Sequence, residues 1–494
     1  MNRRDFLKKW GAATAAASMP GLLSSVSQAG TQPSGSGPNI VFILADDMGY
    51  GDPGCYNPDS RIPTPNIDSL AETGMQFNNA HAPGTWCAPS RYALLTGRFP
   101  LRTHIQKIRH SSAIAAARET IGTLLQKNGY ETGCVGKWHL GIEDGWKDRD
   151  WSQPLRDGPV DRGFDYYFGL AASLDIPPYY YIEDDRPVEP PTEHIEANGS
   201  EGWTKIQGAF WREGKIAPNF RHDEVLPTLI EKSRSFIKRH QKNDPDSPFF
   251  LYLPLTAPHT PWLPDDEYQG ASGAEMYGDF TVQVDDGVGR ILSLLDALDL
   301  RDDTLVFFSS DNGPVWFESD RERTGHHSTG PLRGMKADAW EGGQRMPFLA
   351  SWPGEIPAGS TTDEPVCFTD MLATFASIVG DDLADSDGND SFDISPILFD
   401  EADKEELSRP IIIEDRAIIE DGWKLIYGKA QGGLSRGYGS RKYPRLDGRL
   451  FHLEEDIGED NNLYEDYPEI VEKLQKSLQQ AKKRGRTRPL GCNC

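Results

Sequence analysis

The stretch "NIVFILADD", residues 39–47, decides the architecture of the chain. Five apolar residues run from Ile40 to Leu44 without the polar alternation of a half-buried strand, which is typical of a parallel strand covered on both faces. Two aspartates, Asp46 and Asp47, follow almost at once. Adjacent carboxylates at the end of a buried strand are costly unless a positive group neutralises them. The stretch therefore predicts a buried strand that ends in a charged site.

Further strands and helices alternate along the chain. Apolar strands are predicted in "ETGCVG", "FFLYLPL" and "TLVFFSS", which are residues 131–136, 249–255 and 304–310. Helices are predicted over 66–74, which Gly74 closes, over 120–129, over a stretch that includes 233–240, and over 283–300, where Val288, Ile291, Leu292 and Leu295 share one face. The pattern predicts an α/β fold with a mostly parallel central sheet flanked by helices.

The pattern changes after an acidic loop, "GDDLADSDGND", at 380–390. Short strands with hairpin-like spacing follow in 409–428 and 448–456, and a last helix is predicted over 467–484. This predicts a smaller C-terminal α+β domain with an antiparallel sheet. The predicted units are an export signal at 1–29, a large domain at 38–395 with an insertion at 171–222, a small subdomain at 396–485 and a tail at 486–494.

The first thirty residues have the features of a targeting segment. Paired arginines, Arg3 and Arg4, precede Phe6 and Leu7, and an Ala-rich run leads to "SQAG" at 27–30. This resembles a twin-arginine export signal that is cleaved near Ala29, so we expect a periplasmic or extracellular protein. No later run approaches the length of a membrane span, which predicts a mature protein that is not held in a membrane.

Composition excludes several kinds of partner. The formal net charge of −25 argues against a general binder of nucleic acid or anionic membranes. An anionic substrate must then be held by a local group of cations. The six cysteines, at 55, 87, 134, 367, 492 and 494, are too few for a disulfide scaffold in a chain of 494 residues. For Cys492 and Cys494 we favour disordered thiols over a metal clip or a strained pair.

Four predicted strands end in polar residues that can do chemistry. Asp46 and Asp47 follow the first strand, and Asp311 and Asn312 follow "TLVFFSS". Lys137 and His139 end the second strand, and His259 ends the third. Ligands of open α/β sheets bind at the carboxyl ends of strands, so these residues are expected in one crevice. The oxygen donors among them suit a hard cation, Ca²⁺ or Mg²⁺.

Cys87, in "GTWCAPSRYALLTGR" at 84–98, does not fit such a cation as a thiolate ligand. It also has no Cys or His neighbour at zinc-ligand spacing. A buried packing thiol, half of a disulfide and a reactive sulfur activated by Arg91 or a histidine remain open from the residues alone.

At this point the chain resembles the type I sulfatases of the alkaline-phosphatase superfamily. Their signature, C-x-P-S-R followed by a short apolar stretch and T-G, stands here as Cys87 to Arg91 and Leu94 to Gly97. The resemblance covers nearly all of the mature chain. It continues through "ADDMGYGD", "TPNIDSLAETG", "VGKWHLG", "GFDYYFG", "APHTPW", "SSDNGP", "RGMKADAWEGGQRMP" and "LFHLEEDIGEDNNL".

The resemblance implies an alkaline-phosphatase-like fold and a sulfatase activity on sulfate monoesters. It implies that a formylglycine-generating enzyme oxidises Cys87 to Cα-formylglycine (3-oxoalanine), whose hydrated aldehyde supplies an oxygen nucleophile. It implies metal ligands at Asp46, Asp47, Asp311, Asn312 and the modified residue 87, with Ca²⁺ as the ion and Mg²⁺ as second choice.

The remaining site residues are also carried over from the family pattern. Arg91, Lys137 and Lys336 match the cations that hold the aldehyde hydrate and the sulfate. His139 matches the base that releases sulfate from residue 87, and His259 matches the group that protonates the leaving oxygen. Ser173, in "GLAASLD", matches a sulfate-contacting hydroxyl. The chemistry is consistent, because cations in a dry crevice stabilise the charge that develops as the S–O bond breaks.

Two other functions remain open at this stage. A phosphomonoester or phosphonate monoester hydrolase of the same superfamily would suit the same crevice, and a non-catalytic binder of sulfated glycans would keep the fold. The predicted substrate is a sulfated mono- or oligosaccharide, with aryl sulfates as artificial substrates. Aromatic residues support a sugar-binding surface but would equally pack the insertion against the core: Tyr179, Tyr180, Tyr181, Trp203, Trp211 and Trp262.

Overall fold

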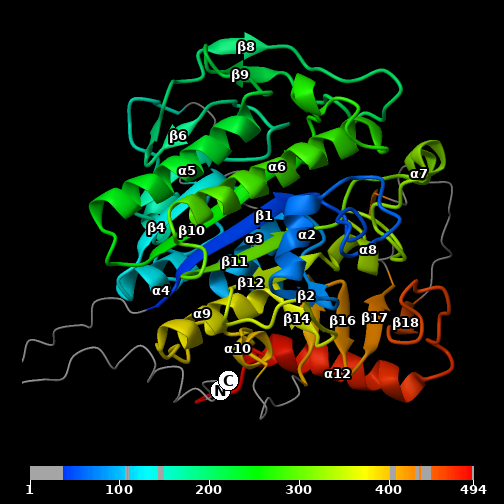
Figure 1. The fold of residues 1–494 in the computed structure, drawn as a ribbon. Helices are drawn as coiled ribbons and strands as arrows, with labels where there is room; N and C mark the ends of the chain where they lie inside the picture. Colours follow the sequence, from blue (N-terminus) through cyan, green and yellow to red (C-terminus); the bar gives the residue numbers. More distant parts are fainter. Residues whose placement is uncertain are drawn as a thin grey trace, which may run out of the picture.

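The computed structural model describes most of the chain (Figure 1). The described residues are 37–105, 108, 111–142, 149–400, 408–428, 433–434 and 447–491. The predicted export signal, Cys492 and Cys494 lie outside these residues.

Ten strands form one sheet within the described residues. In spatial order they are β13 (Ser360–Thr362), β2 (Met75–Phe77), β12 (Phe348–Ser351), β11 (Thr304–Ser310), β1 (Asn39–Asp46), β10 (Phe249–Pro258), β4 (Glu131–Lys137), β5 (Tyr166–Leu170), β6 (Ile182–Glu183) and β7 (Arg186–Pro187). The five central strands, from β11 to β5, are parallel. They are buried along almost their whole length, as the continuous apolar runs predict.

Helices cover both faces of this sheet (Figure 1). One layer holds α2 (Pro65–Glu72), α5 (Val225–Asn243) and α6 (Glu275–Ala297), and the other holds α3 (Cys87–Thr96), α4 (Ile121–Lys127) and α9 (Met371–Val379). The predicted apolar face of α6 is confirmed at Val288, Ile291 and Leu295, which are buried, while Leu292 is half-buried. The mostly parallel, helix-flanked α/β fold is thus confirmed.

The role predicted for Gly74 is wrong. Helix α2 ends at Glu72 with Thr73 as its C-cap, and Gly74, although it comes next, does not have the positive φ of a glycine that closes a helix. A Cβ atom at Gly74 would lie 2.1 Å from the backbone oxygen of Ala350. Glycine is therefore required because the backbone entering β2 passes close to β12, and not because it closes the helix.

A four-stranded antiparallel sheet forms the C-terminal part of the fold, as predicted. Its strands are β15 (Ile411–Ile413), β16 (Ala417–Glu420), β17 (Trp423–Tyr427) and β18 (Gly448–His452), and α12 (Pro468–Arg484) packs on it. A buried salt bridge connects this sheet to the segment that precedes β12, because Lys424 Nζ of β17 lies 2.8 Å from Glu341 Oε1. The same ammonium group lies 2.8 Å from Glu459 Oε1.

The remaining elements are short. They are β3 (Ala80–His81), β14 (Val366–Cys367), β8 (Glu193–Ile195), β9 (Gly214–Ile216), α7 (Glu318–Thr324), α8 (Glu341–Gln344), α10 (Ser395–Leu398) and 3₁₀ turns at Pro100–Arg102, Pro159–Arg162, Asp266–Tyr268 and Phe368–Asp370. Strands β8 and β9 pair with each other above α5 and α6 in Figure 1. In the part of the chain that the structure describes, no helix combines the length and apolar character needed to cross a bilayer.

Candidate active site

The four strands whose ends were predicted to meet are neighbours in the sheet, in the order β11, β1, β10, β4. All of them are parallel, so their carboxyl ends share one edge. This edge brings together the side chains of Asp46, Lys137, His259 and Asp311. The prediction that one crevice collects these residues is confirmed.

Asp46 and Asp47 lie where the regular pairing of β1 ends. The register against β10 shifts between Leu44 and Asp46, and Asp47 adopts a left-handed backbone conformation with φ of 65°. The Asp47 backbone N–H donates to Asp311 Oδ1 over 3.3 Å. The turn therefore presents two successive carboxylates to the same small volume, with 0% and 3% of Asp46 and Asp47 exposed.

Each carboxylate of the cluster has its own cation. Lys137 Nζ lies 2.6 Å from Asp46 Oδ2, and Arg91 Nη2 lies 2.7 Å from Asp311 Oδ2. Lys336 Nζ lies 2.6 Å from Asp47 Oδ1. Arg91 also donates to the backbone oxygen of Lys137 over 2.8 Å, which links α3 to the end of β4.

These pairs set the protonation of the buried groups. Burial alone would raise the pKa of Asp46, but the charges of Lys137, His259 and Arg91 outweigh it and hold that pKa far below its usual range. Burial likewise opposes the charge of Lys137, yet the neighbouring Asp46 raises the pKa of the ammonium above its usual value. The cluster is a set of ion pairs with low access to water.

Cys87 begins α3 and lies inside this cluster. Its Sγ is 3.3 Å from Asp46 Oδ1 and 3.6 Å from Lys336 Nζ. Only 2% of the residue is exposed, and it forms no disulfide. Burial, and after it the charges of Asp311 and Asp46, raises the pKa of the thiol well above its usual value. The side chain is therefore a neutral thiol, and a neutral thiol is a poor nucleophile.

The donors around Cys87 fit a hard cation. Ligand atoms of Asp46, Asp47, Cys87 and His259 lie within 4.8 Å of one another, and all four residues are buried. Asn312 Nδ2 donates to Asp47 Oδ1 over 2.6 Å, whereas its buried Oδ1 has no hydrogen-bond partner among the described residues. A buried carbonyl oxygen without a partner calls for an ion or a water. Carboxylate and amide oxygens are ligands that Ca²⁺ and Mg²⁺ prefer.

The predicted ligands do not all meet in one group. Asp311 is absent from the closest set because its Oδ2 accepts from Arg91 Nε over 2.9 Å and its Oδ1 from the Asp47 backbone. His259 lies in that set instead, with Nε2 3.6 Å from Asp47 Oδ2. Three of the five predicted ligands, Asp46, Asp47 and Cys87, therefore share the closest group.

The two histidines and Ser173 complete the crevice. Ser173 Oγ accepts from Lys137 Nζ over 3.1 Å and lies 3.4 Å from His259 Nε2. His259 Nδ1 lies 2.6 Å from the Thr260 backbone oxygen. His139 has a left-handed φ of 55°, and its Nδ1 is buried without a partner among the described residues. Burial and the charge of Lys137 lower the pKa of His139 far below its usual value, so its imidazole is neutral.

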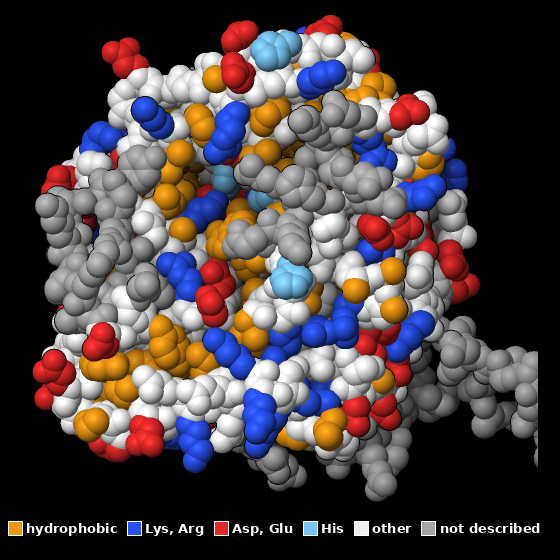
Figure 2. Space-filling model, turned by 180° about the vertical axis from the view of Figure 1, so that it is seen from behind, with side chains coloured by type: hydrophobic (Ala, Val, Ile, Leu, Met, Phe, Trp, Pro, Cys, Tyr) orange, Lys and Arg blue, Asp and Glu red, His pale blue; other side chains and the backbone are white. Residues whose placement is uncertain are grey.

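A cavity of about 480 Å³ opens directly onto these residues. It is lined by Trp86, Cys87, Ile105, Ile108, His139, Gly141, Ala171, Ala172, Ser173, Asp175, Ile176, Pro177, His259 and Lys336. Figure 2 looks onto a hollowed face of the molecule where histidine, basic and hydrophobic side chains gather, the kinds of side chain that line this cavity. The volume suits a ligand of the size of a single sugar ring.

The sequence predicted the charged residues better than the walls of the cavity. Trp86 and Asp175 line it and were not predicted, because neither carries a motif of its own. The aromatic side chains of the insertion are not among the lining residues. Tyr179, Tyr180 and Trp262 are each 1% exposed, which favours the packing alternative for these three.

Comparisons with known proteins agree with this geometry. The family model described as Sulfatase matches residues 38–380. An N-acetylgalactosamine-6-O-sulfatase of Bacteroides thetaiotaomicron is 31% identical in an alignment of 494 positions that covers 90% of this chain and 93% of that protein. The N-acetylgalactosamine-6-sulfatase of Sus scrofa is 34% identical over 78% of this chain and 71% of its own length.

Solved structures are similar over the same extent. One from the metabolism of multiple glycosaminoglycans by Bacteroides thetaiotaomicron is 29% identical, has a TM-score of 0.77, and covers 90% of this chain and 99% of its own. The phosphonate monoester hydrolase of Agrobacterium radiobacter, at 17% identity and a TM-score of 0.57 over 90% of this chain and 96% of its own, shares the fold alone.

Proposed function

Because the chain belongs to the sulfatase family, we propose that it hydrolyses the sulfate monoester of a sulfated carbohydrate, with a 6-sulfated N-acetylgalactosamine unit as the first substrate to test. The observation that carries the proposal is the group of buried cations, Arg91, Lys137 and Lys336, around Cys87, which itself lines a sugar-sized cavity. The names of the two relatives support the choice of sugar.

The nucleophile is proposed to be formylglycine made from Cys87 by a formylglycine-generating enzyme. The neutral buried thiol supports this, since the residue in its encoded form has neither the charge nor the access of a catalytic thiolate. Once formed, the hydrated aldehyde supplies an oxygen nucleophile next to the cations.

A Ca²⁺ ion, with Mg²⁺ as second choice, is proposed to be held by Asp46, Asp47, Asp311, Asn312 and residue 87. The unpartnered Asn312 Oδ1 and the three carboxylates support an ion with a preference for oxygen. When bound, it supplies positive charge that stabilises the sulfuryl group during transfer.

The chain's own residues are proposed to divide the remaining tasks. Lys137 and Lys336 lie within reach of residue 87 and Ser173, where their ammonium groups would bind sulfate oxygens. Arg91 would hold the cluster in place through its hydrogen bonds to the Asp311 carboxylate and the Lys137 backbone oxygen.

Proton transfer is proposed to fall to the two histidines. His259 Nε2 faces Ser173 and the cavity, which suits the donation of a proton to the leaving sugar oxygen. His139 is neutral with an unpartnered Nδ1, which suits the acceptance of a proton from residue 87 when sulfate is released.

The proposal includes export by the twin-arginine-type segment, which would place the enzyme where sulfated polysaccharide fragments occur.

The test of the activity is a substrate panel. Purified protein, produced together with a formylglycine-generating enzyme, would be assayed on sulfated monosaccharides, an aryl sulfate, a phosphate monoester and a phosphonate monoester. We expect the highest kcat/KM on a sugar sulfate. Faster hydrolysis of the phosphorus esters would instead identify the alternative activity.

Two measurements test the site itself. Mass spectrometry of the peptide around residue 87 should show the aldehyde in active protein, and elemental analysis should show calcium or magnesium. Full activity with an unmodified thiol, or with stoichiometric zinc in place of both metals, would contradict the proposed chemistry.

A further inference from the structure

One charged side chain in the cavity has no role in the proposed chemistry. Asp175 lies two residues after Ser173 and lines the cavity, with 6% of the residue exposed. Its Oδ2 pairs with Arg212 Nη1. Its other oxygen, Oδ1, is buried and has no hydrogen-bond partner among the described residues.

This unpartnered oxygen belongs to an ionised group. Burial works to raise the pKa of Asp175, but the charges of His259 and Arg212 outweigh it and the pKa is lowered. An ionised carboxylate only accepts hydrogen bonds, and a buried acceptor without a donor is expensive. A donor group on a ligand of the cavity would satisfy Oδ1.

The carboxylate is held firmly in position. Arg212 Nη1 donates to the backbone oxygen of Asp175 over 3.0 Å as well as to Oδ2, and its guanidinium lies 5.1 Å from the centre of the Phe210 ring. The backbone N–H of Arg212 adds a further bond to the same backbone oxygen over 3.3 Å. Because three hydrogen bonds from Arg212 hold the residue, Oδ1 has a defined direction and can discriminate between ligands.

Other roles fit less well. Asp175 is outside the group of residues whose ligand atoms could share an ion. His259 is oriented by other atoms, since its Nδ1 lies 2.6 Å from Thr260 O and its Nε2 faces Ser173 and Asp47. The salt bridge with Arg212 uses Oδ2 alone and leaves Oδ1 without a partner among the described residues.

The sign of the charge narrows the ligand. Lys336 and His259 line the same cavity and attract an anion, whereas Asp175 repels one. A substrate that suits both the cations and Asp175 has its sulfate at the cations and a neutral hydroxyl donor beside Asp175. A second sulfate or a carboxylate at that position would face the charge of Asp175.

We propose that Asp175 Oδ1 accepts a hydrogen bond from the free ring hydroxyl that lies nearest to the sulfated position, and thereby selects monosulfated rings. The inference rests on the proposed function. In a ring sulfated at position 6, carbon 5 carries the ring oxygen, so the nearest ring hydroxyl is the one at position 4.

The test combines one variant with matched substrates. Wild-type protein, Asp175→Asn and the control Asp185→Asn would be assayed on N-acetylgalactosamine 6-sulfate, its 3-deoxy and 4-deoxy analogues, its 4,6-disulfate, and 4-nitrophenyl sulfate. Asp185 is a suitable control because it lies in the same insertion, 43% of its side chain is exposed, and its carboxylate lies 3.7 Å from Arg186. All three proteins would carry the modified residue 87, and their thermal unfolding would be compared.

The expected result is a non-additive loss. Wild-type kcat/KM should fall about 10- to 100-fold from the monosulfate to the 4-deoxy analogue, because one hydrogen bond to a charged group is lost. Asp175→Asn should lose a similar factor on the monosulfate and little more on the 4-deoxy analogue. Asp175→Asn should also reduce the difference in kcat/KM between the monosulfate and the disulfate, while Asp185→Asn behaves as wild type.

An equal loss of Asp175→Asn on the monosulfate and on both deoxy analogues would overturn the inference, because it would mean a structural role. The inference would also be contradicted if the ratio of kcat/KM on the monosulfate to kcat/KM on the disulfate were the same in Asp175→Asn as in the wild type. If the wild-type protein hydrolysed none of the sulfate esters, the proposed function itself would be contradicted. The aryl ester, 4-nitrophenyl sulfate, tests that function independently of Asp175, because it has no sugar hydroxyl.

Discussion

Replacing Lys137 by methionine should destabilise the folded protein through the carboxylate that it leaves behind. Lys137 Nζ lies 2.6 Å from Asp46 Oδ2, and both side chains are 0% exposed. The nearest other cation, Arg91, is 3.7 Å from Asp46 and is engaged at 2.7 Å with Asp311. Removing one partner of a buried pair costs about 3–5 kcal/mol. We expect the free energy of unfolding to fall by this amount in the presence of a chelator.

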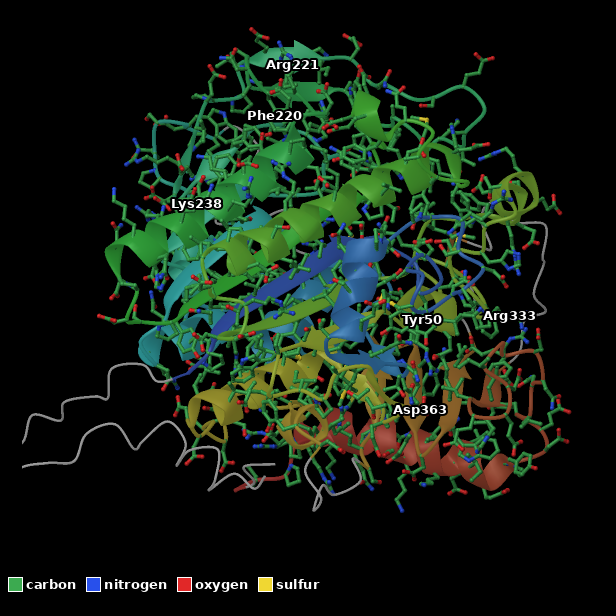
Figure 3. All side chains as sticks on the ribbon, in the orientation of Figure 1. Tyr50, Phe220, Arg221, Lys238, Arg333 and Asp363 are labelled. Atoms are coloured by element: carbon green, nitrogen blue, oxygen red, sulfur yellow. The ribbon has the colours of Figure 1, made fainter. Side chains whose placement is uncertain are left out.

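Calcium should return part of this loss. A divalent cation bound beside Asp46 would supply the positive charge that Lys137→Met lacks, so the stabilisation by added calcium should be larger in the variant than in the wild type. The assay is urea denaturation followed by tryptophan fluorescence, with chelator and with calcium. The matched control is Lys238→Met, an exposed lysine on the outer side of α5 (Figure 3), which should change stability by less than about 0.5 kcal/mol.

Two outcomes would refute this reasoning. A Lys137→Met protein as stable as wild type in chelator would mean that Asp46 takes up a proton or reaches water without cost. An equal response of both proteins to calcium would mean that no cation binds close to Asp46, and the proposed metal site would have to be abandoned.

Three further predictions follow from the same structure. His222 is stacked on Trp211 at 4.6 Å, and burial lowers its pKa from 6.5 to about 4. The folded state therefore favours the neutral ring. The contribution of this group to the free energy of unfolding is fully present above pH 6.5 and is lost as pH falls through 4, by about 3 kcal/mol at most. His222→Phe should flatten this part of the pH–stability curve, which urea titrations at stepped pH would measure. Cys87 is 2% exposed, so a formylglycine-generating enzyme should convert the unfolded chain but not the folded thiol form, which mass spectrometry after in vitro treatment of both forms would check. His259→Ala should lose far more rate on sugar sulfates than on aryl sulfates with good leaving groups, whereas His139→Ala should release one equivalent of alcohol and then stop with sulfate retained, which burst kinetics and intact mass would separate; the same leaving-group sensitivity in both variants would mean that the two roles are wrongly assigned.

The sequence was sufficient to predict which strands carry the site. A run such as Ile40–Leu44 allows few environments other than a parallel strand covered on both faces, and parallel strands end at a common edge. Asp46, Lys137, His259 and Asp311 could therefore be placed together although they are far apart in the chain. The C-terminal antiparallel sheet was predictable from a different pattern, since its short strands are separated by turn residues.

The walls of the cavity could not be predicted in this way. Asp175 and Trp86 lie in loops, where no periodicity links a residue to a direction in space. The aromatic residues of the insertion show the same limit, because Tyr179 pairs its ring with His222 at 4.5 Å inside the fold. Composition identifies an aromatic-rich segment but not whether its rings face a ligand or the core.

Charge balance explains how such a site can exist in a chain with a net charge of −25. The buried cluster contains equal numbers of formal charges of each sign, carried by Asp46, Asp47, Asp311, Arg91, Lys137 and Lys336. A balanced cluster of this kind can be buried before any ion binds, because each carboxylate already has a cation. A divalent cation would then make the cluster net positive, which is the condition for attracting an anionic ester against the field of the whole protein. In that arrangement Asp175 stands apart from the balanced pairs at the wall of the cavity, and this is why we assign its unpaired oxygen to the sugar rather than to the sulfate.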